Sequence, residues 1–132
     1  MPSLFEQIGG EAGLRRVVNA FVDRLFDDMM IGFMFRKTTR ERVKEKEYEF
    51  AAGHLGGNVP YTGKPLREAH APHAIQGGQF NRRLQILKET LAELDVPAPV
   101  VAHWIAHTES LRQVVTLGAG DACDPTLAAR PR

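Results

Sequence analysis

Apolar side chains recur every three or four residues along most of the chain, which is the spacing of one face of an α-helix. The stripe from Leu14 to Phe26 predicts a helix over about 11–28. The stripe from Phe80 to Leu94 predicts another over about 76–94, and Val100 to Val115 mark the last helix. No segment alternates apolar and polar residues long enough to indicate a strand. The pattern therefore predicts an all-α fold.

Two possible capping boxes indicate where further helices begin. Ser3 is followed three residues later by Glu6, and Thr38 by Glu41. In this motif the hydroxyl and the carboxylate each accept a hydrogen bond from a free N–H of the first turn. The first box predicts a short N-terminal helix, and the second predicts a helix that runs to about Leu55.

Glycine and proline mark the breaks between the predicted helices. Gly9-Gly10 and Gly56-Gly57 are expected to end helices where the chain turns sharply, and Asp95–Pro99 separates the last two helices. The apolar patch Ile31–Phe35 is expected to form a tight turn or a short helical piece. Residues 118–132 lack periodicity and are expected to form a flexible tail.

Composition is that of an ordinary globular protein. Of the 132 residues, 43% are hydrophobic and 25% charged, and 17 basic against 16 acidic residues give a formal charge of +1. These values suggest one domain over 1–117 and neither a nucleic-acid nor a membrane partner. With no long apolar run and no signal-like start, a cytoplasmic location is expected. The single cysteine, Cys123, lies in the tail and is given no role.

The segment from Ala51 to Ala74 carries the most specific motifs of the chain. They are Leu55-Gly-Gly57, Tyr61-Thr-Gly63 and Leu66-Arg-Glu-Ala-His-Ala-Pro72, preceded near the N-terminus by Phe5-Glu-Gln-Ile-Gly-Gly10. In this order they resemble the truncated haemoglobins, and Ile105–Arg112 is similar to the last helix of that family's first group. The resemblance covers about 3–117. It implies a two-over-two helical sandwich that encloses haem b.

The resemblance also implies which residues contact the haem. His70 matches the proximal histidine that ligates iron, a role suited to a neutral imidazole. The histidines at 54, 103 and 107 are better explained as surface or partly buried residues. Phe35 matches a phenylalanine that packs on the porphyrin, and Lys46 either reaches a propionate or is a solvated lysine of the helix face. The remaining residues implied to line the proximal side and the rim are Tyr61, Leu66, Ile75 and Phe80.

The distal side departs from the family's pattern. Val22 stands where the family usually has a tyrosine that hydrogen-bonds the ligand, and Val43 and Glu47 match its two distal positions on the next long helix. Val43, Glu47 and Phe50 share one helix face. Arg83 borders the apolar stripe of the following helix. Two alternatives follow for these charges. Glu47 and Arg83 form an ion pair, or share a water molecule, above the iron. Otherwise, a small rotation of either helix leaves one or both side chains in solvent.

The sequence therefore favours a haem protein that reversibly binds dioxygen, nitric oxide or carbon monoxide, with an unidentified reductant as partner. An alternative is a peroxidase-like or nitric-oxide-detoxifying enzyme in which Glu47 and Arg83 assist the chemistry. A third class is a globin-like module that senses a ligand or has lost its haem. The sequence leaves open the diatomic ligand, the resting sixth ligand, and whether the protein is a monomer or a weak homodimer.

Overall fold

The computed structural model of the protein describes residues 2–63 and 77–112. The predictions for Leu66, His70 and Ile75, and for the tail at 118–132, lie outside the described residues. Within them every regular element is helical, as expected from the periodicity. The elements are α1 (Leu4–Gln7), α2 (Gly10–Asp27), the short 3-10 helix η1 (Gly32–Phe35), α3 (Arg40–His54), α5 (Gly77–Glu93) and α6 (Ala98–Ser110).

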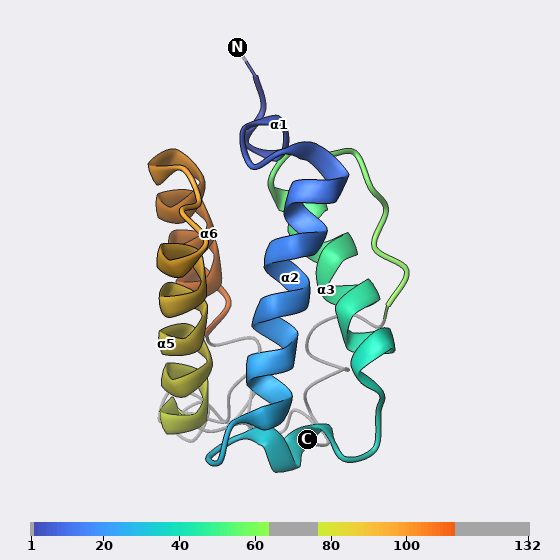
Figure 1. Ribbon diagram of the computed structural model, residues 1–132, viewed down its shortest axis with the longest axis vertical. Coiled ribbons are helices and arrows are strands. Elements are labelled where there is room, and N and C mark those ends of the chain that lie inside the picture. The colour runs from blue at the N-terminus through green and yellow to red at the C-terminus, as the bar shows by residue number, and fades with distance from the viewer. Residues whose placement is uncertain (1, 64–76, 113–132) are drawn as a thin grey trace, which may run out of the picture.

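The long helix α2 lies between two sets of neighbours (Figure 1). Its contacts are most numerous with α3 on one side and α5 on the other, while α6 packs against α5 and α1. The turn and η1 follow α2 at its lower end, and from there the chain returns upward as α3. This layout brings α3 and α5, which are distant in sequence, to the two flanks of one central helix.

The first predicted cap is confirmed and the second is wrong by one residue. The Ser3 hydroxyl accepts from the Glu6 N–H at 3.1 Å, and the Glu6 carboxylate accepts from the Ser3 N–H at 2.9 Å. At α3 the cap is Thr39, whose hydroxyl accepts from the Arg42 N–H at 3.1 Å. Thr38 instead ends the turn after η1, because its N–H donates to the carbonyl of Phe35.

The glycine pairs end helices as the sequence predicts. Gly9, Gly10 and Gly56 have φ values of 108°, 66° and 89°, in the left-handed region that residues with a Cβ enter only at a steric cost. Gly57 has a different constraint, since a Cβ there would lie 2.7 Å from the ring of Phe5. These turns fix the angle at which α2 leaves α1 and the direction in which the chain leaves α3.

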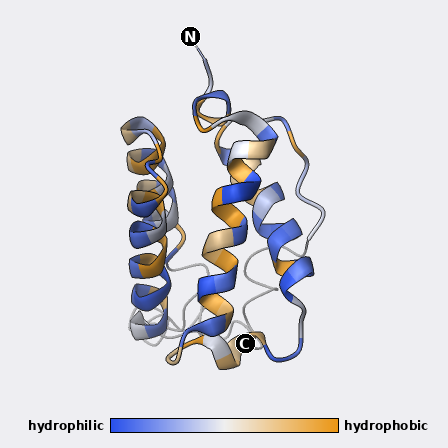
Figure 2. Cartoon of the chain, viewed as in Figure 1, coloured by the Kyte–Doolittle hydropathy of each residue, from blue (hydrophilic) through white to orange (hydrophobic). Residues whose placement is uncertain are grey.

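The core lies between α2 and its neighbours, and α2 and α5 show both apolar and polar positions, while α3 is mostly hydrophilic (Figure 2). Phe21 and Val22 of α2, Leu87 of α5 and Trp104 of α6 are almost fully buried. Among the described residues, no helix has the length and apolar character needed to cross a bilayer.

Candidate functional site

An ion pair joins α3 to α5 beside the ring of Phe21 of α2. One terminal nitrogen of Arg83, Nη2, lies 3.2 and 3.1 Å from the two carboxylate oxygens of Glu47. The side chains are only 28% and 16% exposed, and the Arg83 guanidinium carbon stands 4.9 Å from the centre of the Phe21 ring. The structure thus contains the pairing considered from the sequence, with neither side chain turned fully into solvent.

The residues predicted to share a face with Glu47 do line the same side of α3. Val43 and Phe50 are half-buried there, and Phe35 of η1 stacks on Phe26 with ring centres 4.8 Å apart. Val22, in contrast, is fully buried in the core. It has no polar atom in its side chain, so the position where the family's tyrosine is expected supplies no hydrogen-bond donor.

Tyr61 lies beside this face, on the chain that follows α3. Its ring meets Phe50 edge-on, with centres 5.6 Å apart. Burial raises the pKa of the Tyr61 hydroxyl, and the nearby carboxylates of Glu47 and Glu49 raise it further. The phenol therefore stays protonated and neutral at physiological pH, while the place of Tyr61 at the rim of a haem pocket remains a prediction.

A carboxylate that the sequence analysis did not single out fixes the chain at Thr62. Glu49 is only 8% exposed and accepts from both the backbone N–H and the hydroxyl of Thr62, each at 2.8 Å. Lys46 donates to the same hydroxyl and lies 3.6 Å from Glu49. The hydrogen bond from the Thr62 backbone is the main cause that lowers the pKa of Glu49.

This network gives Lys46 partners within the chain, while its proposed contact with a propionate remains a prediction. Thr62 lies shortly before the segment that contains His70, and the network holds Thr62 itself against α3. One signal was available in the sequence: Glu49 interrupts the run of apolar residues near the end of α3, three residues after Lys46. Phe80, the other predicted lining residue that the structure describes, is buried, with the Arg112 guanidinium over its ring.

Three histidines form a cluster where the end of α3 meets α6. The rings of His54 and His107 stack with centres 4.0 Å apart, and Nε2 of His103 lies 2.9 Å from the backbone oxygen of His54. All three are partly buried, as predicted, although their grouping was not. Burial, followed by repulsion from His107 and His103, lowers the pKa of His54 from 6.5 to about 3.

The same causes act on the second ring of the stack. Burial lowers the pKa of His107, and His103 lowers it further. The Nδ1 atom of His54 is buried with no hydrogen-bond partner. Within 2–63 and 77–112, no group of histidine, cysteine and acidic side chains has the geometry of a metal site.

The side chains around the Glu47–Arg83 pair suit a flat, largely apolar group such as haem. Phe35, Val43 and Phe50 are apolar yet only half-buried, although Phe35 and Val43 pack against the core and Phe50 contacts Tyr61. A planar apolar ligand would cover such surfaces, and the ion pair beside them carries no net charge. The described residues thus fit the walls of a haem pocket, with the histidine expected to hold iron in the segment that follows Thr62.

Comparison with known proteins identifies the family of the chain. The sequence model of the family described as "Bacterial-like globin" matches residues 3–117. The chain belongs to this globin family. It is 31% identical over 116 residues to the group 1 truncated hemoglobin GlbN of Mycolicibacterium paratuberculosis, covering 88% of this chain and 85% of that one.

Solved structures agree with the assignment. The Fe(III) form of the truncated hemoglobin from Tetrahymena pyriformis is 27% identical with a TM-score of 0.78, covering 87% of this chain and 98% of that one. A 2/2 hemoglobin from Synechococcus, at 23% identity, shares the fold with a TM-score of 0.81 over 86% and 98% of the two chains. The expected truncated-globin fold is confirmed, and membership of a globin family implies a haem cofactor.

Proposed function

We propose that this globin holds haem b through His70 and reversibly binds dioxygen or another diatomic gas. The observation that carries the proposal is the Glu47–Arg83 ion pair, set among half-buried aromatic residues between α3 and α5. Haem would supply an iron that binds the gas, and His70 its protein ligand. Phe35 would pack against the porphyrin plane.

Arg83 takes the role that the family usually gives to a tyrosine. Its pairing with Glu47 uses a single terminal nitrogen, so the guanidinium keeps further N–H donors. A donor of this kind stabilises the partial negative charge of bound dioxygen. Because Glu47 neutralises the cation, the pair adds a donor without adding net charge. That combination favours neutral diatomic ligands over anions.

A peroxidase-like activity is the second candidate, and the same pair supports it. A carboxylate beside a guanidinium can take the proton from hydrogen peroxide while the cation stabilises developing negative charge. Glu47 is sufficiently enclosed, at 16% exposure, for that interaction to be strong. Oxidation of nitric oxide by dioxygen would instead need only the gas-binding site and an outside reductant.

Absorption spectra test the proposal directly. The purified protein should bind equimolar haemin and give globin-type ferric, ferrous and carbon-monoxide spectra, and His70→Ala should lose the histidine-ligated form. His73→Ala, three residues further along, is the matched control and should keep it. If the purified protein is colourless and does not bind added haemin, the proposed haem function is refuted.

Two further measurements distinguish a gas-binding function from a peroxidase function. A stable oxygenated spectrum in air supports gas binding. Rapid oxidation of a reducing dye by hydrogen peroxide, lost in Glu47→Gln, supports the peroxidase instead.

A further inference from the structure

The turn between α2 and η1 exposes apolar side chains to an unusual degree. Met29 is 99% exposed, Met30 60% and Phe33 49%, and these are the exposed large hydrophobic residues of the described chain. We call these three residues the apolar tip. They lie within five consecutive positions at the end of the molecule where α2 meets η1 (Figure 1). Ordinary folding gives no reason to place three such side chains together in water.

The tip is held in place by the residues around it. The Asp28 carboxylate, 6% exposed, accepts from the N–H groups of Met30 and Ile31 at 2.9 and 3.1 Å. Arg82 of α5 donates to the same carboxylate at 2.9 and 2.7 Å. Ile31 is buried on the inner side of the turn. The two methionines are therefore presented by an anchored turn, and their flexible thioether chains adapt well to a partner.

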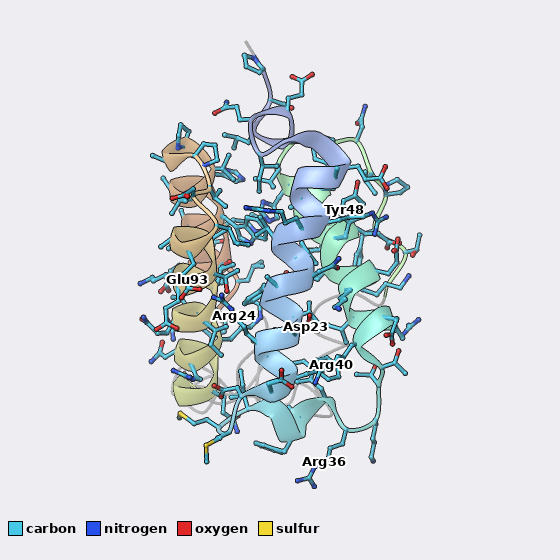
Figure 3. The ribbon with its side chains drawn as sticks, viewed as in Figure 1. Asp23, Arg24, Arg36, Arg40, Tyr48 and Glu93 are labelled. Atoms are coloured by element: carbon cyan, nitrogen blue, oxygen red, sulfur yellow. The ribbon has the colours of Figure 1, made fainter. Side chains whose placement is uncertain are left out.

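The charges beside the tip are positive. The acids at this end of α2 are already paired, Asp27 with Arg40 and Asp28 with Arg82. Arg36 and Lys37 follow η1 directly, are exposed, and form no ion pair with any carboxylate of the described residues. Figure 3 shows Arg36 pointing away from the body of the protein. An acidic partner would complement this rim, whereas a second copy of the chain would meet like charge.

We propose that the apolar tip, with Arg36 and Lys37, is the docking surface for an acidic electron-donor protein. The inference rests on the proposed haem function. Phe33 belongs to the same short helix as Phe35, the residue expected to contact the porphyrin, so a donor seated on the tip lies close to the haem. With haem bound, one electron would pass from the donor's reduced iron–sulfur cluster or flavin to the ferric iron and leave it ferrous. The donor is oxidised by one electron and no bond breaks.

The size of the tip favours a transient protein partner over a membrane. Electron-transfer complexes use small interfaces in which charged rims speed encounter. Stable membrane attachment takes two strong signals, such as a lipid chain with a polybasic patch, and three apolar side chains with two cations fall short of that.

Stopped-flow reduction of the ferric holoprotein under carbon monoxide tests the proposal. The donor is a plant-type ferredoxin, kept reduced by its reductase and NADPH. Arg36→Glu/Lys37→Glu should lower the second-order rate constant at low salt roughly ten- to a hundredfold and remove most of its salt dependence. Met29→Gln/Met30→Gln should lower it by a smaller factor. Arg16→Glu/Lys88→Glu, an equal charge change at exposed sites away from the tip, should stay within about twofold of wild type.

Other outcomes separate this inference from the proposed function. If dithionite reduces all variants alike but ferredoxin reduces the tip variants at the wild-type rate, the docking surface is refuted while the haem function stands. If no variant binds haem, the proposed function itself fails. If the wild type binds to anionic phospholipid vesicles and the tip variants do not, the partner is a membrane surface and the proposal of a protein partner is refuted. A dimer that Met29→Gln/Met30→Gln dissociates would also overturn it, in favour of a second copy.

Discussion

Replacing His54 with phenylalanine is expected to make the fold less sensitive to acid. His54 lies at the end of α3 against His107 and His103, and no carboxylate is among the charges that shift its pKa. Burial is the largest cause of its low pKa, of about 3. Phenylalanine preserves a flat ring for stacking on His107 but cannot take up a proton.

The size of the effect follows from proton linkage. In the unfolded chain His54 binds a proton below its ordinary pKa of 6.5, whereas in the folded protein it stays neutral down to about pH 3. Unfolding in this window takes up a proton, so stability is full above pH 6.5 and falls as the pH decreases. At pH 5, one and a half units below 6.5, the loss amounts to about 2 kcal/mol.

Urea denaturation of the holoprotein at pH 7 and pH 5, followed by circular dichroism, measures this loss. Other titrating groups, His70 included, contribute alike to the wild type and the variant and cancel in the comparison. His54→Phe should therefore lose about 2 kcal/mol less than wild type between the two pH values. His103→Gln should keep most of the acid sensitivity, because repulsion from His103 contributes less to the low pKa of His54 than burial does. Equal pH dependence in wild type and His54→Phe would refute the reasoning.

Two further predictions concern the carboxylates near the site. Arg83→Leu should destabilise the fold by about 1–2 kcal/mol in urea, because Glu47 keeps a largely enclosed carboxylate without its cation. Glu47→Leu/Arg83→Leu should recover most of this loss, and an additive loss would contradict the pairing. Glu49→Leu should cost about 2 kcal/mol and speed amide exchange at Thr62, because two hydrogen bonds to a buried carboxylate are removed. Glu45→Gln, exposed on the same helix, is its control and should change stability little.

The helices α2, α5 and α6 were predictable because each has an apolar stripe, whereas α3 was predicted from a capping motif and from the glycine pair that follows it. Their ends were harder to locate, and α3 shows why. Thr38 and Thr39 are both capable of capping a helix, and only the tertiary turn after η1 decides between them, since it uses the N–H of Thr38. Gly9-Gly10 left no such choice, because a positive φ strongly favours glycine.

The site was predictable only in part. Sequence matching gave an ion pair between Glu47 and Arg83 as one of two alternatives, since two charges facing one apolar space are stable together only when paired. The role of Glu49 depends on where the chain after α3 passes, which no periodicity encodes. The histidine cluster has the same origin: His54 and His103 are 49 residues apart and meet only through the angle between α3 and α6.

The enclosed carboxylates are stabilised by nearby cations or hydrogen-bond donors, and this distinguishes them from the histidine cluster. Glu47, Glu49 and Asp28 are each enclosed, and each has a cation or several N–H donors in reach. The hydrogen bond from the Thr62 backbone lowers the pKa of Glu49, and hydrogen bonds from Arg82 lower the pKa of Asp28, so the contacts of these two carboxylates vary little with pH over the physiological range. Within the part of the chain that the structure describes, the charged groups that shift the pKa of His54 and His107 are other histidines, and the two rings remain packed because they stay neutral. Among the described residues, acid should therefore act first on the contact between α3 and α6.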